Sequence, residues 1–163
     1  MAQQIALISA EAFAITSMLQ GATAGVASRE RPYGRHCGDS IRSELDHCEE
    51  NRRYRSFFSG HASVSFTMAS TTCSHHLRHE LFGSALADGL TCGVALSSAA
   101  TVAMMRVVGK QHYLSDVMTG ALVGTLSGVG VPWLLHYGIG GDADELSVQV
   151  DLTGPGLNLR GVF

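Results

Sequence analysis

The sequence is poor in charged residues. Asp, Glu, Lys and Arg make up 15% of its 163 residues, and hydrophobic residues make up 45%. Because about a quarter is the usual charged share in soluble domains, this composition favours a helical membrane protein or an unusually buried bundle. The formal net charge of −3 gives no reason to expect a nucleic-acid partner. The length suits a single domain with a real core.

The sequence also lacks a CxxC motif and a recognisable secretory signal. Cys37 and Cys48 share a polar loop and could pair in an oxidising compartment, whereas Cys73 and Cys92 lie in apolar runs and are expected to be buried thiols. The N-terminus has neither a basic region nor a small-residue cleavage site. We therefore expect that the chain inserts through its own helices or that an upstream part is missing.

Four apolar runs predict four long helices, at residues 5–27, 56–74, 81–105 and 117–135. The first would be about 35 Å long at 1.5 Å per residue, enough to span a bilayer although Glu11 interrupts it. The last carries three glycines at four-residue spacing, Gly120, Gly124 and Gly128, which allow close helix packing. Pro132 should kink or end this helix.

The remaining segments are polar. A short helix is expected near residues 43–53, and residues 138–163 alternate around Gly154-Pro155-Gly156 like a weak hairpin. The predicted fold is therefore all-α: a bundle of about four long helices over residues 1–137, followed by a short irregular or hairpin-like C-terminal tail at 138–163.

Three polar clusters lie at the ends of the apolar runs: RERPYG at 29–34, FFSGH at 57–61 and MRVVGKQHYLSD at 105–116. If each run crosses a layer or bundle once, the chain leaves at 28, re-enters at 57, leaves at 106 and re-enters at 117. All three clusters then lie at one end, and the HHLRH turn and the tail lie at the other.

The third cluster holds a candidate nucleophile. His112 and Asp116 are four residues apart, so on a helix they would share one face within hydrogen-bonding reach. A nucleophilic imidazole needs one nitrogen free and the other held by an acceptor. Arg106 would lie near the same mouth, and its planar guanidinium suits a tetrahedral oxyanion. Taken alone, the pair is equally well explained by a solvated helix start.

The second cluster holds a candidate anion site. Ser59 is expected to cap the following helix, so that the free N–H groups of its first turn point towards an acceptor.

Read together, RERP at 29–32, SGH at 59–61 and R-x5-H-x3-D at 106–116 resemble the three signature motifs of the type 2 phosphatidic acid phosphatase superfamily. That superfamily also contains bacterial acid phosphatases and vanadium haloperoxidases. The resemblance covers roughly residues 20–137 and makes the helical part, 1–137, a phosphatase-like core. It implies a phosphatase that hydrolyses a phosphomonoester or pyrophosphate, with a lipid phosphate favoured, through a phosphohistidine. It implies no metal and no other cofactor.

The resemblance also implies a role for each matching residue. His112 would be the nucleophile, oriented by Asp116, and His61 would protonate the leaving oxygen and then activate water. Cationic or donor groups would hold the phosphoryl oxygens as charge develops: Arg31, Arg106, the Ser59 hydroxyl and the Gly60 amide.

The chain departs from the motif pattern at three positions. Ala24 stands where the family has a lysine, Phe58 where it has a proline and Met105 where it has a serine. Loss of one preorganised donor typically costs on the order of a hundredfold or more in rate, although Lys110 or Arg29 could substitute. A catalytically impaired membrane or interaction protein that keeps the fold is therefore the alternative.

Two further alternatives use other chemistry. A haloperoxidase with vanadate at the same site ranks below hydrolysis, because those relatives are generally much larger chains. A zinc site could form from residues at i, i+3 and i, i+4 spacing: Cys73, His75, His76 and His79. A polar turn between helices is favoured instead, because no second ligand cluster completes the set.

Membrane placement follows from the uncharged runs at 89–105 and 117–135, although Ser, Thr and Gly weaken their hydropathy. The resemblance implies a bacterial inner membrane with the site on its outer face, whereas the positive-inside rule would place the arginine-rich loop in the cytoplasm. A soluble periplasmic bundle is the alternative. Because family membrane enzymes usually have six helices and four runs are visible here, the chain would be either a copy that lacks an N-terminal pair or a divergent copy. A lipid phosphate, an isoprenyl pyrophosphate and a small soluble phosphomonoester each fit as substrate.

Overall fold

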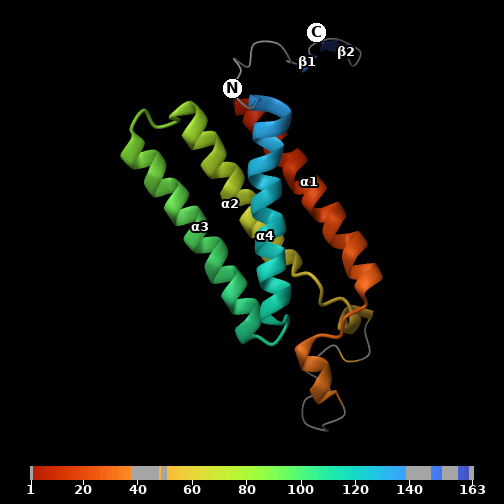
Figure 1. Ribbon diagram of the computed structural model, residues 1–163. Coiled ribbons are helices and arrows are strands. Elements are labelled where there is room, and N and C mark those ends of the chain that lie inside the picture. The colour runs from red at the N-terminus through yellow and green to blue at the C-terminus, as the bar shows by residue number, and fades with distance from the viewer. Residues whose placement is uncertain (1, 38–47, 49–50, 139–147, 152–157, 162–163) are drawn as a thin grey trace.

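A computed structural model describes residues 2–37, 48, 51–138, 148–151 and 158–161. The helical part is a bundle of four α-helices, in which α2 packs against each of the other three (Figure 1). The helices are α1 (Ala2–Ala27), α2 (Gly60–His79), α3 (Ala85–Val108) and α4 (Leu114–Gly130). The all-α prediction is confirmed. α4 continues as a π-helical segment, η3 (Val131–Tyr137), so the helix changes at Pro132 as expected.

The central helix α2 is rich in serine and threonine, and most of its hydroxyls are hydrogen-bonded within the bundle. Thr67, Thr71 and Ser74 each donate to the main-chain carbonyl four residues earlier, at 2.8 to 2.9 Å. The Thr67 hydroxyl also pairs with that of Thr16 on α1, at 2.9 Å. Because buried polar groups are costly only when unpaired, this polar helix is stable at the centre of the bundle.

Glycines allow α4 to lie directly against α2. A Cβ at Gly120 would meet the Ser59 carbonyl oxygen at 2.6 Å, and Cβ atoms at Gly124 and Gly128 would come even closer to main-chain oxygens of α2. Any larger side chain would push the two helices apart. The close approach expected from the four-residue glycine spacing is confirmed.

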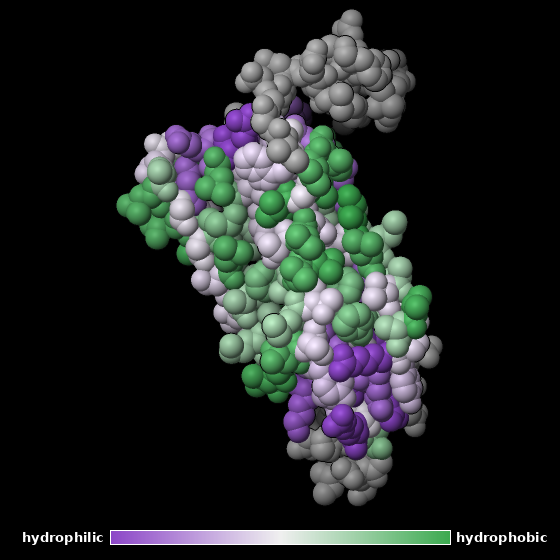
Figure 2. Space-filling model, in the orientation of Figure 1, coloured by the Kyte–Doolittle hydropathy of each residue, from purple (hydrophilic) through white to green (hydrophobic). Residues whose placement is uncertain are grey.

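The bundle has a small-residue interior and an apolar surface. Its buried cluster is Ala62, Ala103 and Val117, whereas large apolar side chains are exposed along α3: Leu86, Leu90, Val94, Met104, Met105 and Val108. Figure 2 shows hydrophobic surface along the bundle, with hydrophilic residues gathered towards its two ends. Within the described ranges, three helical stretches are long and apolar enough to cross a membrane: Ala2–Arg35, Ala85–Val108 and Leu114–Tyr137. This distribution indicates a membrane-associated protein.

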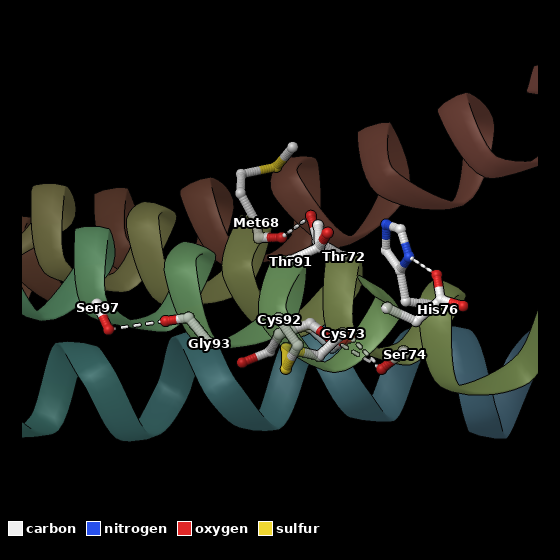
Figure 3. The surroundings of a disulfide bond; sticks show 12 residues. Met68, Thr72, Cys73, Ser74, His76, Thr91, Cys92, Gly93 and Ser97 are labelled. Atoms are coloured by element: carbon white, nitrogen blue, oxygen red, sulfur yellow. Dashed lines mark hydrogen bonds and ion pairs between the residues drawn. A yellow bond between two sulfur atoms is a disulfide. The ribbon is translucent and has the colours of Figure 1, made fainter. Parts of the chain in front are cut away.

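Both cysteine pairs are disulfides. The Cys37–Cys48 pairing agrees with one of the expectations for the polar loop. The expectation that Cys73 and Cys92 are buried thiols is wrong, because they form a bond between α2 and α3 (Figure 3). The neighbouring helices place their Cα atoms 4.8 Å apart, which is within the range that a disulfide spans.

The disulfide removes Cys73 from the alternative zinc site. His76 bonds Asp88 at 2.5 Å, and His75 bonds the Tyr137 hydroxyl at 2.5 Å. In the part of the chain that the structure describes, no group of three or more His, Cys, Asp or Glu side chains could hold a metal ion.

Two 3₁₀ segments flank the polar loop between α1 and α2: η1 (Pro32–His36) and η2 (Asn51–Tyr54). Of the short helix expected near 43–53, residues 43–47 and 49–50 lie outside the described residues. The tail contains the antiparallel pair β1 (Val148–Asp151) and β2 (Asn158–Gly161), as the hairpin pattern predicts. Its expected turn, Gly154-Pro155-Gly156, lies outside the described residues.

Candidate active site

One pocket of about 770 Å³ lies at the end of the bundle where the three polar clusters meet. It lies between the C-terminal half of α1, η1, η2, the start of α2 and the α3–α4 turn, and η1, η2 and the α3–α4 turn lie in the lower half of Figure 1. Its lining residues are Ser17, Gln20, Arg31, Tyr33, Arg52, Arg55, Gly60, His61, Val64, Ser65, Arg106, Gln111 and His112. The prediction that the three clusters share one end is confirmed.

His112 is a buried, neutral imidazole held by the main chain. Its Nδ1 donates to the Ser56 carbonyl oxygen at 2.7 Å, and because a carbonyl only accepts, Nδ1 must carry the proton. Nε2 therefore keeps its lone pair. Burial, reinforced by the charges of Arg31 and Arg106, lowers the pKa of His112 to about 4. A neutral imidazole with a free Nε2 is the form that can act as a nucleophile.

The α3–α4 turn brings His112 to Arg106. The main-chain amides of Gln111 and His112 both donate to the Arg106 carbonyl oxygen, at 3.1 and 3.2 Å. These two hydrogen bonds to one carbonyl oxygen fold the residues after α3 back onto the last turn of that helix. The R-x5-H spacing therefore places both side chains on the pocket wall.

Asp116 does not make the hydrogen bond to His112 that the four-residue spacing suggested. Its carboxylate lies 4.0 Å from His112 Nδ1 and accepts instead from the Ser56 hydroxyl at 2.5 Å and from the Tyr113 amide at 3.1 Å. The reason is that α4 begins at Leu114, so His112 precedes the helix and does not share its face with Asp116. The Asp116 carboxylate therefore fixes Ser56 through its hydroxyl, and the Ser56 carbonyl in turn fixes the His112 ring.

Arg31 is fixed by neutral acceptors. Its Nε donates to the Arg52 carbonyl at 2.9 Å, and its Nη1 donates to the Gln111 side chain at 3.1 Å. No carboxylate bonds this guanidinium among the described residues, so its positive charge faces the pocket uncompensated.

Arg106 carries a second uncompensated charge. Its Nε is buried and has no hydrogen-bond partner among the described residues. Among the residues that the structure describes, no Asp or Glu lines the pocket. Because a partly buried cation without a counter-charge is costly, an anion between Arg31 and Arg106 would supply the missing partner.

His61 and the first turn of α2 form another wall of the pocket. Burial, together with the charges of Arg106 and Arg31, lowers the pKa of His61 below its ordinary value. Gly60 begins α2 and lines the pocket, and the first amides of a helix have no partner within it. The Gly60 and His61 amides can therefore donate to an anion, whereas the Ala62 amide donates to the Ser59 hydroxyl.

Ser59 caps α2, as expected, because its hydroxyl accepts from the Ala62 amide at 3.4 Å. The residue is fully buried, and its own amide donates to the Asp116 carbonyl at 3.0 Å. Ser59 is not among the residues that line the pocket. The structure therefore brings together Arg31, Gly60, His61, Arg106 and His112, and leaves Ser59 and Asp116 behind them.

No cation reaches the pocket from α1. Ala24 is buried, and this helix contributes Ser17 and Gln20. Neither residue considered as a substitute lines the pocket: Arg29 pairs with Asp116 at 2.5 Å, and Lys110 is exposed in the α3–α4 turn.

Arg52 and Arg55 do line the pocket, and neither was identified from the motifs. The concentration of seven arginines between residues 28 and 57 was the available signal. It did not distinguish arginines that face the pocket from those that support the loop.

Fold and site together define an all-α, membrane-type bundle with a pocket lined by arginines and histidines at one end. The chain belongs to the PAP2 superfamily, whose family model matches residues 5–139. This confirms the family that the three motifs resemble. No curated protein and no solved structure matches the chain. Membership indicates phosphatase-type activity on phosphate esters.

Proposed function

We propose that the protein is a phosphatase that hydrolyses a phosphomonoester or pyrophosphate through a phosphohistidine on His112. In the first step Nε2 forms a bond to phosphorus while the bond from phosphorus to the leaving oxygen breaks, and His61 gives that oxygen a proton. In the second step His61 takes a proton from water, the water oxygen bonds to phosphorus, and the N–P bond breaks. Phosphate leaves, and both histidines return to their starting states.

The observation that carries this proposal is the neutral His112, held at Nδ1 by Ser56, in a pocket lined by Arg31 and Arg106, neither of which bonds a carboxylate among the described residues. Arg31 and Arg106, with the Gly60 amide, would bind the phosphoryl oxygens as their charge grows in the transition state. Phosphoryl transfer depends mainly on such positioning and charge stabilisation. Ser59 and Asp116 would support these groups without touching the substrate.

A lipid phosphate is the favoured substrate because of the surface around the pocket. The bundle exposes large apolar side chains along α3, and its pocket opens at a polar end. A bundle that crosses a bilayer would therefore present the pocket at headgroup level, where a lipid phosphate lies.

The experiment is phosphate release by the detergent-purified protein from a lipid phosphate, an isoprenyl pyrophosphate and a small soluble phosphomonoester. His112→Ala should lower release at least a thousandfold, because without the nucleophile the residual rate comes from binding alone. His136→Ala is the matched control, since His136 bonds Glu11 at 2.7 Å and does not line the pocket. Its rate should stay within about twofold of the wild type.

Release that survives His112→Ala would rule out the phosphohistidine. A folded wild-type protein that releases phosphate from none of the three substrates would support the alternative, a catalytically impaired protein that retains the fold. The observation that favours this alternative is Ala24, because α1 supplies no cation to the pocket.

A further inference from the structure

Two arginines that follow α1, two residues apart, bond to different kinds of acceptor. Arg29 donates to the Asp116 carboxylate at 2.5 Å, so its charge is compensated. Arg31 donates only to neutral oxygens among the described residues. The type of acceptor therefore decides which of the two arginines keeps a charge that can attract an anion.

Four hydrogen bonds hold the Arg31 guanidinium, and one of them comes from a side chain. Nε donates to the Arg52 carbonyl at 2.9 Å, and Nη2 donates to the Arg55 carbonyl at 3.4 Å. Nη1 donates to two oxygens of Gln111, the side-chain amide oxygen at 3.1 Å and the main-chain carbonyl at 3.4 Å. A guanidinium has five N–H donors and no acceptor. One N–H of Nη2 is therefore left without an acceptor among the described residues.

Gln111 also connects Arg31 to the second arginine that is proposed to bind the phosphoryl group. Its main-chain amide donates to the Arg106 carbonyl at 3.1 Å, and it lines the pocket beside His112. One residue therefore fixes the Arg31 guanidinium relative to the turn that carries Arg106 and His112.

Two carboxylates close to Arg31 along the chain or in the site are occupied by other arginines. Glu30, the preceding residue, pairs with Arg53 at 2.5 Å, and Asp116 pairs with Arg29 at 2.5 Å. A neutral acceptor completes this arrangement, because it restrains the Arg31 guanidinium without compensating its charge.

We infer that Gln111 is a positioning residue for Arg31: its side-chain oxygen fixes the guanidinium in the pocket and, because it is neutral, leaves the charge to the phosphoryl group. This inference rests on the proposed function and adds to it the residue that holds the phosphoryl-binding arginine. A donor that is already in place costs no reorganisation as charge develops in the transition state. Gln111 acts through Arg31 and is assigned no contact with the substrate.

The first test removes the side-chain acceptor. Gln111→Met keeps the length of the side chain and should lower kcat/KM for phosphate release by about tenfold, the size expected for a lost hydrogen bond to a charged group. In an Arg31→Ala protein the same substitution should lower kcat/KM less than about twofold, because its effect passes through Arg31. A similar loss in both backgrounds, or no loss in either, would overturn the inference.

Gln20→Met is the matched control. Gln20 also lines the pocket, and its side chain donates to the Phe58 carbonyl at 3.2 Å. The same chemical change should therefore have the same effect whether or not Arg31 is present. If Gln20→Met depended on Arg31 as strongly as Gln111→Met, the coupling would not be specific to Gln111 and the inference would fail.

A second substitution separates the position of the guanidinium from its charge. Gln111→Glu keeps the shape and the bond to Arg31 but adds a carboxylate that compensates the guanidinium. Phosphate affinity should therefore fall below that of Gln111→Met, while the melting temperature stays at or above that of Gln111→Met. Higher phosphate affinity in Gln111→Glu than in Gln111→Met would show that an acceptor of either charge suffices, which contradicts the inference.

Binding of inorganic phosphate tests the inference without turnover. In the His112→Ala protein, calorimetry should show that Gln111→Met weakens phosphate binding by about tenfold when Arg31 is present and by less than about twofold when it is alanine. Equal weakening in both cases would overturn the role of Gln111. Phosphate release that survives His112→Ala would instead reject the proposed function, and the binding comparison would still decide whether Gln111 acts through Arg31.

Discussion

The carbonyl oxygen of Ser56 accepts the Nδ1 proton of His112 at 2.7 Å, while the hydroxyl of the same serine donates to the Asp116 carboxylate at 2.5 Å. One residue therefore connects the candidate nucleophile to the buried acid. A neutral carbonyl acceptor orients the imidazole, and the carboxylate affects the imidazole only indirectly, through Ser56.

This arrangement predicts a graded response to substitution at the carboxylate. Asp116→Asn should lower kcat by roughly 10- to 100-fold, whereas loss of a carboxylate bonded directly to a catalytic histidine costs about 10⁴-fold. Ser56→Ala keeps the carbonyl and should cost less than Asp116→Asn. The measurement is steady-state kinetics beside His112→Ala. A defect in Asp116→Asn as large as that of His112→Ala would contradict the indirect link.

The pH dependence should have an acidic optimum. His112 must be neutral to attack, so kcat/KM should rise as the pH increases through about 4. His61 must be protonated to act as the acid. Burial and the charges of Arg106 and Arg31 lower its pKa below the ordinary histidine value of 6.5, so kcat/KM should already fall as the pH rises through a value below 6.5. The profile is measured with correction for ionisation of the substrate. A kcat/KM that still rises above pH 7 would contradict these assignments.

The contact between α2 and α4 should tolerate no side chain at Gly124. A Cβ there would overlap the Ser63 carbonyl oxygen, so Gly124→Ala should destabilise the bundle by about 1–3 kcal/mol, the usual cost of overpacking. Thermal unfolding in detergent measures the effect. Gly93→Ala on α3 is the control, because its Cβ would meet nothing within 4 Å. Equal melting temperatures for the two variants would show that the helices are not packed this closely.

The two disulfides should have different effects. Replacing Cys37 and Cys48 with serine releases the loop between Arg31 and Arg52, so phosphate affinity should fall along with stability. Replacing Cys73 and Cys92 releases α2 from α3 far from the pocket and should lower stability by roughly 2–4 kcal/mol without changing phosphate affinity. Calorimetric titration with phosphate, together with melting curves, separates the two effects. Loss of affinity only in the second variant would reverse the assignment.

Several features could be predicted because they depend on local pattern. Apolar runs of helical length predict α1 to α4, since a helix of that composition can only be covered by lipid or by other helices. Gly120, Gly124 and Gly128 predict close packing, because their spacing places them on one helix face. Counting the crossings then places the three polar clusters at one end.

Other features depend on contacts between segments far apart in the chain. The acceptor for His112 is a main-chain atom 56 residues away. Every residue has a main-chain carbonyl, so the residue type at that position does not reveal this role. The four-residue spacing pointed to Asp116 because it assumed a helix that starts only at Leu114. Similarly, the Cys73–Cys92 bond depends on the register between α2 and α3, which neither helix specifies by itself.

The sequence by itself therefore determined the helices, the end of the bundle where the polar motifs gather, and the family to which those motifs belong. Only the tertiary structure decided which atom orients His112, which arginines reach the pocket and which cysteines pair. The physical reason is that hydropathy and spacing act along one segment, whereas hydrogen bonds and disulfides require two segments to meet at a particular distance.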